Sequence, residues 1–215
     1  ATIILLGDEI VLDGLPHDGL VRDALGPQLP GWLRRLGVEV IATEYISDEL
    51  NLVVDAFAKA AKSSDIIFTT GGTADGPRDH VHAAIAELKG ELIVDRVKVR
   101  PGHPMLLAHI NNVPLVGLPG NPQSAIVALL TLGQPVIDAL MGRKKVELNQ
   151  IVTGDDIDVP EGFTRLVLGN VVDGWFEMGE YLGSAMLRGL AHSNGFAVAD
   201  KSMEEGEMIA WLPLP

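Results

Sequence analysis

The sequence predicts a three-layer α/β fold, in which helices cover a sheet of mainly parallel strands, followed by a small β domain. Residues 1–144 alternate short β-type runs with helical patterns, which is typical of such a sheet. After a basic turn near residue 143 the helical periodicity stops, and short alternating segments separated by glycines follow. Hydrophobic residues make up 47% of the 215 residues, enough for a sizeable core. We therefore predict an α/β domain at 1–144 and a small β domain at 145–215.

The strands of the first domain are expected where apolar runs are bounded by turn residues. These runs lie at residues 1–6, 38–46, 65–70, 92–99 and 113–118. Between the second and third runs, Leu50, Val53 and Phe57 recur at helical spacing, with Asp55 and Lys59 on the opposite face. This pattern predicts an amphipathic crossover helix.

Two more helices follow the third strand. The first carries an apolar stripe from Val81 to Leu88, starts with Pro77 in its first turn and ends before Gly90. The second covers residues 121–140 and is apolar on nearly every side, so we expect it to be buried and to be bent or broken at Pro135. Residues 23–36 give the weakest pattern.

Composition excludes several classes of function. The net charge is −13, and nucleic-acid binding needs a basic face, so we expect no nucleic-acid partner. The longest stretch that is apolar apart from one threonine, Ala125–Leu132, is far shorter than the roughly 20 residues that span a bilayer, and no basic-then-apolar leader opens the chain. We expect a cytoplasmic protein with no membrane contact. Without cysteine, only oxygen and histidine donors remain for a metal, which favours magnesium.

Charge is unevenly distributed between the two predicted domains. Residues 1–144 have a balance of −5 and residues 145–215 a balance of −8. Any anionic ligand must therefore be bound locally, and we expect the C-terminal domain not to bind anions.

The loop after the third strand, TTGGTADGPRDH at 69–80, combines features of an anion site. Gly71 and Gly72 have no side chains, so their backbone N–H groups can approach an anion closely, and Thr73 adds a hydroxyl. Asp79 in the first helical turn is either a helix-start acid or a functional carboxylate. His80 and His82 face different sides of the helix and are not expected to share a metal.

Two further loops carry candidate anion-binding groups. In LPGNPQSA, 118–125, Gly120 allows a tight turn, Asn121 is a natural N-cap and Pro122 suits the first helical position. In VKVRPGHP, 97–104, Lys98 and Arg100 share one face of a strand and form a candidate phosphate clamp. A well-capped helix and a solvated strand face are the structural alternatives.

Acidic residues follow three of the expected strands. They are Asp8 and Glu9, then Asp48, then Asp75 and Asp79. Because the carboxyl ends of parallel strands meet at one edge, these groups would repel one another unless a cation is present. A magnesium ion bound by one or two of them, together with ligand oxygens, is the expected solution.

Four motifs together resemble the MoeA family and the related gephyrin E domains. They are GDE at 7–9, TTGGTADGPRDH at 69–80, VRPGHP at 99–104 and GLPGNPQSA at 117–125, in the order and spacing of that family. The resemblance covers the whole chain. It implies the MogA/MoeA-like molybdopterin-binding fold, followed by a small C-terminal β-barrel.

The resemblance implies a role in molybdenum cofactor biosynthesis. Family members insert molybdate into adenylated molybdopterin and release AMP, with a divalent cation such as Mg²⁺ assisting. By similarity, Glu9, Asp48 and Asp79 match the catalytic and metal-binding acids. Pterin, phosphate and molybdate would contact Gly71, Gly72, Thr73, Gly76, Lys98, Arg100, Pro119, Gly120, Asn121, Pro122 and Ser124. The expected partners are a second copy, forming a dimer, and a MogA-like adenylyltransferase.

Several positions depart from the family pattern. Leu6 replaces a small hydroxyl residue, Leu25 replaces an asparagine, and Asp75 adds a negative charge to the glycine loop. Complete family members also have two N-terminal domains, so the resemblance implies transferase activity when the full-length chain supplies them. One alternative is a non-catalytic pterin- or partner-binding paralogue, which these departures favour. The other is a CinA-like nucleotide pyrophosphatase, and the LPGNP motif and the barrel argue against that second alternative.

Overall fold

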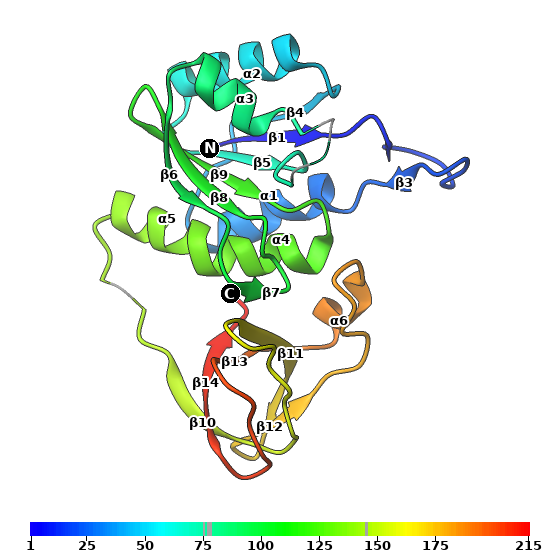
Figure 1. The fold of residues 1–215 in the computed structure, drawn as a ribbon, viewed down its shortest axis with the longest axis vertical. Coiled ribbons are helices and arrows are strands. Elements are labelled where there is room, and N and C mark those ends of the chain that lie inside the picture. Colours follow the sequence, from blue (N-terminus) through cyan, green and yellow to red (C-terminus); the bar gives the residue numbers. More distant parts are fainter. Residues whose placement is uncertain (75, 77–78, 145) are drawn as a thin grey trace.

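A computed structural model describes residues 1–74, 76, 79–144 and 146–215, and these form two large sheets (Figure 1). The first sheet has the strand order β4-β1-β5-β9-β8-β6. Its strands are β1 Thr2–Leu6, β4 Ala42–Ile46, β5 Ile67–Thr70, β6 Glu91–Asp95, β8 Leu106–Ile110 and β9 Val113–Leu118. β4, β1, β5 and β9 pair in parallel, whereas β8 and β6 continue the sheet in antiparallel pairing. The predicted mainly parallel sheet is confirmed.

Helices cover both faces of this sheet because its buried strands alternate their side chains between two apolar layers. α2 and α3 pack against Ile4 and Leu6 of β1, whereas α1 and α4 pack against Ile3 and Leu5. Figure 1 shows the two helix layers above and below the sheet. The helices are α1 Leu25–Arg35, α2 Leu50–Ser63, α3 Val81–Glu87, α4 Pro122–Ala128 and α5 Gln134–Leu140.

The long helix differs from the prediction at its centre. A π-helical turn, η1 Leu129–Gly133, joins α4 to α5, so the helix continues through Pro135 and is irregular before it. Proline cannot donate to the carbonyl four residues earlier, and the wider turn accommodates the mismatch. By length and composition alone Pro122–Leu140 could cross a membrane, but 61% of its 18-residue apolar stretch is buried inside the fold, as in a core helix.

The second sheet closes into a five-stranded barrel. Its strands are β10 Asn149–Thr153, β11 Thr164–Val172, β12 Trp175–Met178, β13 Gly195–Ala199 and β14 Met208–Pro213. β12 pairs with both β10 and β11, which closes the ring. Phe176 and Trp211 pack in its core with ring centroids 6.0 Å apart. The barrel that the resemblance implied is therefore present, while the exact domain boundary at 144/145 stays a prediction.

Two expected strands are shorter than the sequence suggested. β4 begins only at Ala42, because the backbone N–H of Val38 closes the end of α1 on the Leu33 carbonyl and residues 38–41 cross to the sheet. β6 ends at Asp95, and the chain then turns to form β7, Val99–Arg100, which pairs with β11 of the barrel. Lys98 precedes β7, so Lys98 and Arg100 do not share the long strand face that was predicted.

An arm extends from the sheet between β1 and α1 (Figure 1). It contains two short parallel strands, β2 Ile10–Val11 and β3 Val21–Arg22. The arm ends at Asp23, whose Oδ1 accepts the backbone N–H groups of Leu25 and Gly26 at 3.0 Å and so starts α1. These two hydrogen bonds satisfy backbone N–H groups in the first turn of a helix that the sequence pattern indicates only weakly.

Candidate functional site

Three loops at the carboxyl ends of β1, β5 and β9 line one hollow of about 670 Å³. Neighbouring parallel strands bring their carboxyl ends to the same edge, which is where open α/β sheets bind ligands. The predicted site residues that line it are Glu9, Gly71, Gly72, Thr73, Asp79, Pro119, Gly120, Asn121 and Pro122. The structure thus brings most of the predicted loop residues together.

Two walls of this hollow were not predicted from the sequence. The arm contributes Ile10, Val21 and Asp23, and the barrel side contributes Met186 and Leu187, at the start of α6, Leu187–Ala191. These residues carry no motif, and only the fold places them beside the glycine loop. Ile10, Val21, Met186 and Leu187 add apolar surface to the lining, whereas Asp23 adds a charged group.

The glycine loop is tightly fitted against β1. Gly71 has φ 76° and Gly72 has φ 62°, a region that favours glycine. A Cβ on Gly71 would lie 2.9 Å from the Leu6 carbonyl oxygen. The Gly71 N–H donates to the Leu118 carbonyl at 3.1 Å, so it is not free for an anion as the sequence suggested. Close packing accounts for this glycine.

Asp79 closes the same loop on itself. Its Oδ2 accepts the Gly76 N–H at 2.5 Å, and its own N–H donates to the Gly76 carbonyl at 3.0 Å. α3 begins at Val81 with His80 as its N-cap, so the prediction that Asp79 lies in the first helical turn is wrong. Gly76 does not line the hollow. The predictions for Asp75 and Pro77 fall outside the described residues.

The acidic residues separate into two groups. Glu9 and Asp79 line the hollow, whereas Asp48 does not. Asp48 and Asp8 each accept the other's backbone N–H at 3.3 Å. Burial, followed by the charges of Glu9 and Asp8, raises the pKa of Asp48 despite the backbone hydrogen bond. Within the described part of the chain, no three His, Asp or Glu side chains are grouped to bind a metal ion.

The two histidines after the glycine loop contact different partners. Nε2 of His80 lies 3.1 Å from the Asp48 carbonyl oxygen, and Nε2 of His82 lies 3.0 Å from Oδ1 of Asp95. The two histidine side chains therefore contact different parts of the chain.

The start of α4 is tied to the barrel. Asn121 is the N-cap and Pro122 opens the helix, as predicted, but the Asn121 side chain does not cap it and instead donates to Ser184 Oγ at 3.3 Å. The Gln123 N–H donates to the Ser184 carbonyl at 2.9 Å, and proline has no N–H. Fewer amides are therefore free here than the predicted anion cradle requires.

Arg100 lies in a second, smaller hollow of about 230 Å³ between the start of α4 and the barrel. Its guanidinium stacks over the Phe163 ring, 4.9 Å from the centroid. Arg165 of β11, which the sequence analysis missed, is paired with Arg100 across the strands, and Gln123 is a third polar group in the lining. The only sequence signal was an arginine next to the apolar run 166–168. Lys98 and Ser124 line neither hollow.

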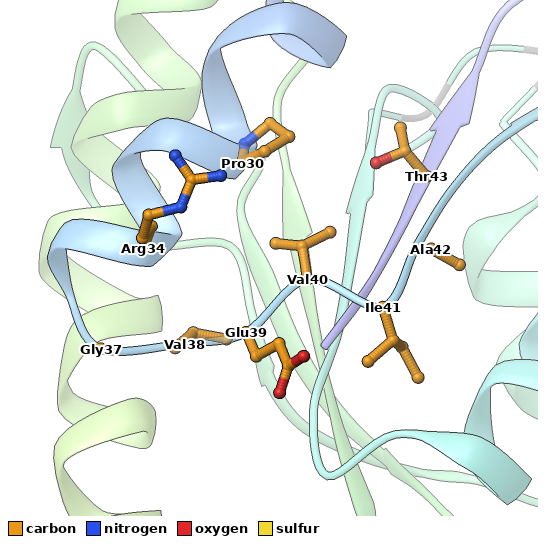
Figure 2. Close-up of a pocket in the computed structure, with 9 residues that line it drawn as sticks. All are labelled: Pro30, Arg34, Gly37, Val38, Glu39, Val40, Ile41, Ala42 and Thr43. Carbon is orange, nitrogen blue, oxygen red and sulfur yellow. The ribbon is translucent and has the colours of Figure 1, made fainter.

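A third hollow, of about 730 Å³, lies at the amino end of the sheet between α1 and the chain entering β4. Figure 2 shows Arg34 of α1 and Glu39 of the connection around it. It contains no predicted site residue, and its charged groups have opposite signs.

Comparison with known families identifies the first part of the chain. The family model described as "Probable molybdopterin binding domain" matches residues 2–139. A molybdopterin molybdenumtransferase of Staphylococcus aureus (strain COL) is 26% identical over 168 residues, covering 77% of this chain and 40% of the relative. The protein of that name from Nostoc sp. is 28% identical over 228 residues, covering 99% of this chain and 52% of the relative. The chain thus spans about half, or less, of the length of these relatives.

Solved structures agree on the fold. A molybdopterin biosynthesis MoeA protein from Pyrococcus horikoshii superposes with a TM-score of 0.83 at 22% identity, covering all of this chain and 54% of that one. A CinA protein from Thermoplasma acidophilum superposes with a TM-score of 0.52 at 16% identity and covers 63% of this chain. The first similarity includes the barrel.

Proposed function

Because this chain belongs to the family of probable molybdopterin-binding domains, we propose that it binds a phosphorylated molybdopterin ligand in molybdenum cofactor biosynthesis. Curated relatives are named molybdopterin molybdenumtransferase. The specific reaction we propose is insertion of molybdate into adenylated molybdopterin with release of AMP, by a protein of the full length of these relatives, of which this chain spans about half or less.

The observation that supports this proposal is the 670 Å³ hollow at the carboxyl ends of three parallel strands. Its volume falls within the range of about 300–1,000 Å³ usual for small-molecule sites. Its lining includes the hydroxyl residues Thr70 and Thr73 together with the apolar residues Ile10 and Leu187. A flat heterocycle with polar edges fits such a lining.

The smaller hollow brings two arginines together, whereas the larger one has Arg22, whose guanidinium contacts Asp13 and the Gly14 carbonyl. Arg100 and Arg165 lie side by side on paired strands, and two like charges so placed destabilise a sheet unless an anion is bound. We therefore assign the molybdate oxyanion to this hollow. This assignment departs from the expectation that the C-terminal part binds no anion, because a net charge averages over a surface while a site depends on local groups.

Magnesium fits the larger hollow only as an ion shared between protein and ligand. Glu9 and Asp79 offer carboxylate oxygens there, and Mg²⁺ commonly takes one or two carboxylates together with substrate phosphates. When bound, the ion would neutralise phosphate charge and polarise the phosphorus–oxygen bond that joins AMP to molybdopterin. Asp79 would also keep the glycine loop closed through Gly76. The protein supplies positioning and charge, and no side-chain nucleophile is needed.

We also propose a cytoplasmic location, as the composition indicates, and a dimer with a MogA-like adenylyltransferase as partner, as the family resemblance implies. The alternative of a non-catalytic binding paralogue is favoured by Leu6, which is buried and lines the hollow without the family's hydroxyl. A CinA-like pyrophosphatase accounts for the α/β part and leaves the barrel unexplained.

Calorimetric titration with AMP, with and without Mg²⁺, tests the proposal. Wild-type protein should bind AMP more tightly with Mg²⁺, and Asp79→Ala should remove most of that difference because one carboxylate is lost. Asp55→Ala is the matched control, since Asp55 is an exposed aspartate on the far side of α2 from the sheet. Equal Mg²⁺ dependence in all three proteins would refute the proposed site. AMP binding with no turnover by the full-length protein would favour the paralogue.

A further inference from the structure

The side chain of Gln123 is buried but has an unused hydrogen-bond donor. Gln123 is 2% exposed, and its Nε2 has no hydrogen-bond partner among the described residues. Its backbone is fixed, since the N–H donates to the Ser184 carbonyl at 2.9 Å. A buried donor without an acceptor destabilises a fold, so such a group calls for an explanation.

The surroundings of Gln123 indicate what would satisfy it. The side chain lines the 230 Å³ hollow together with Arg100 and Arg165. The protein itself restrains both guanidinium groups: Arg100 stacks on Phe163, and Nη1 of Arg165 donates to the Asp158 carbonyl at 2.7 Å. The hollow therefore presents donors from two strands and one helix, and its other lining residues are Pro101, Leu166, Val167, Leu168 and Leu182.

We propose that Gln123 is a specificity-determining residue, whose Nε2 donates a hydrogen bond to an oxygen of a tetrahedral oxyanion bound between Arg100 and Arg165. This inference rests on the proposed function for the assignment of an oxyanion to this hollow. Guanidinium groups donate only, and the amide adds a further donor. Such a set favours a fully deprotonated dianion, every oxygen of which accepts, over an anion that keeps a hydroxyl group.

The test compares Gln123→Met with wild type. Methionine has a similar size but cannot donate, so the Kd for molybdate should rise roughly tenfold, as expected for a lost hydrogen bond to a charged group. The melting temperature of the ligand-free variant should stay the same or rise, because the unsatisfied donor is gone. A purely structural glutamine would give the opposite result, a lower melting temperature with an unchanged Kd.

Gln134→Met is the matched control, because Gln134 lies on the same long helix but lines a different hollow. It should leave the Kd for molybdate unchanged. In wild-type protein, molybdate should bind more tightly than phosphate at pH 6, where most phosphate is the monoanion with two hydroxyl groups, and Gln123→Met should reduce that preference. Equal Kd values for wild type and Gln123→Met, or no molybdate binding by wild type, would overturn the inference.

Titration with AMP and Mg²⁺ separates this inference from the proposed function. Gln123→Met should bind AMP like wild type, since the larger hollow does not include Gln123. If wild-type protein binds molybdate but not AMP, and Gln123→Met weakens the molybdate binding, the nucleotide part of the proposed function is refuted while the role of Gln123 is supported.

Discussion

Replacing Gly71 by alanine should destabilise the protein far more than the same change at Gly120, although both glycines line the same hollow. Gly71 has φ 76°, and a Cβ there would lie 2.9 Å from the Leu6 carbonyl oxygen. At Gly120 the nearest atom to a Cβ is the Gly71 Cα, at 3.8 Å, which is ordinary contact. The two variants therefore differ in backbone strain and not in chemistry.

The expected magnitude follows from two contributions at Gly71. A left-handed backbone conformation costs an alanine about 1–2 kcal/mol. The contact with a backbone oxygen, which cannot rotate away, requires a main-chain shift that costs about another 1–2 kcal/mol. For a chain of this size, a loss of about 3 kcal/mol corresponds to a fall in melting temperature of roughly 6–12 °C. Gly120→Ala should stay within about 2 °C of wild type.

Thermal melts followed by circular dichroism, with all three proteins under identical conditions, give the comparison. Ligand-free protein is used so that binding does not contribute to the apparent stability. If Gly71→Ala and Gly120→Ala melt within about 2 °C of each other, the close approach of the glycine loop to β1 is wrong. The positions of the loop groups in the hollow would then need revision.

Two predictions concern ionisable groups beside the site. Burial and the hydrogen bond to Asp23 raise the pKa of Tyr45 to about 12 from 10.0, so the stability that Tyr45 contributes is complete below pH 10 and is lost as the pH rises through 12. Absorbance at 295 nm in a Tyr181→Phe background should show this titration. A midpoint near pH 10 would contradict the raised pKa. Burial, with the charges of Glu9 and Asp8, raises the pKa of Asp48 above 3.8. The neutral Asp48 carboxyl therefore stabilises the fold below that pH, and this stabilisation is lost as the carboxyl ionises at higher pH. Asp48→Asn should therefore raise the melting temperature more at pH 7 than at pH 3, and an equal effect at both values would argue against a raised pKa.

Much of the α/β architecture could be predicted because each element carries its own pattern. The buried run of β1 and the stripe of α2 through Val53 and Phe57 have the periods of a strand and a helix. The predictions that failed concern places where a distant partner decides the conformation. β4 starts late because residues 38–41 bond to the end of α1 and to Ala1, and β7 exists because β11 lies beside it.

The sequence by itself determined which loops carry glycine, threonine and acid side chains, and the parallel order of the strands places those loops at one edge. Backbone motifs are local, so a single chain segment is enough to reveal them. Only the tertiary structure decided which donors are already used: Gly71 by Leu118, Gly76 by Asp79, and the Gln123 backbone by Ser184. It also separated Arg100 from the glycine loop and paired it with Arg165, because the barrel packs on the sheet through β7. Contacts between residues far apart in the sequence set these partners, and no local pattern encodes them.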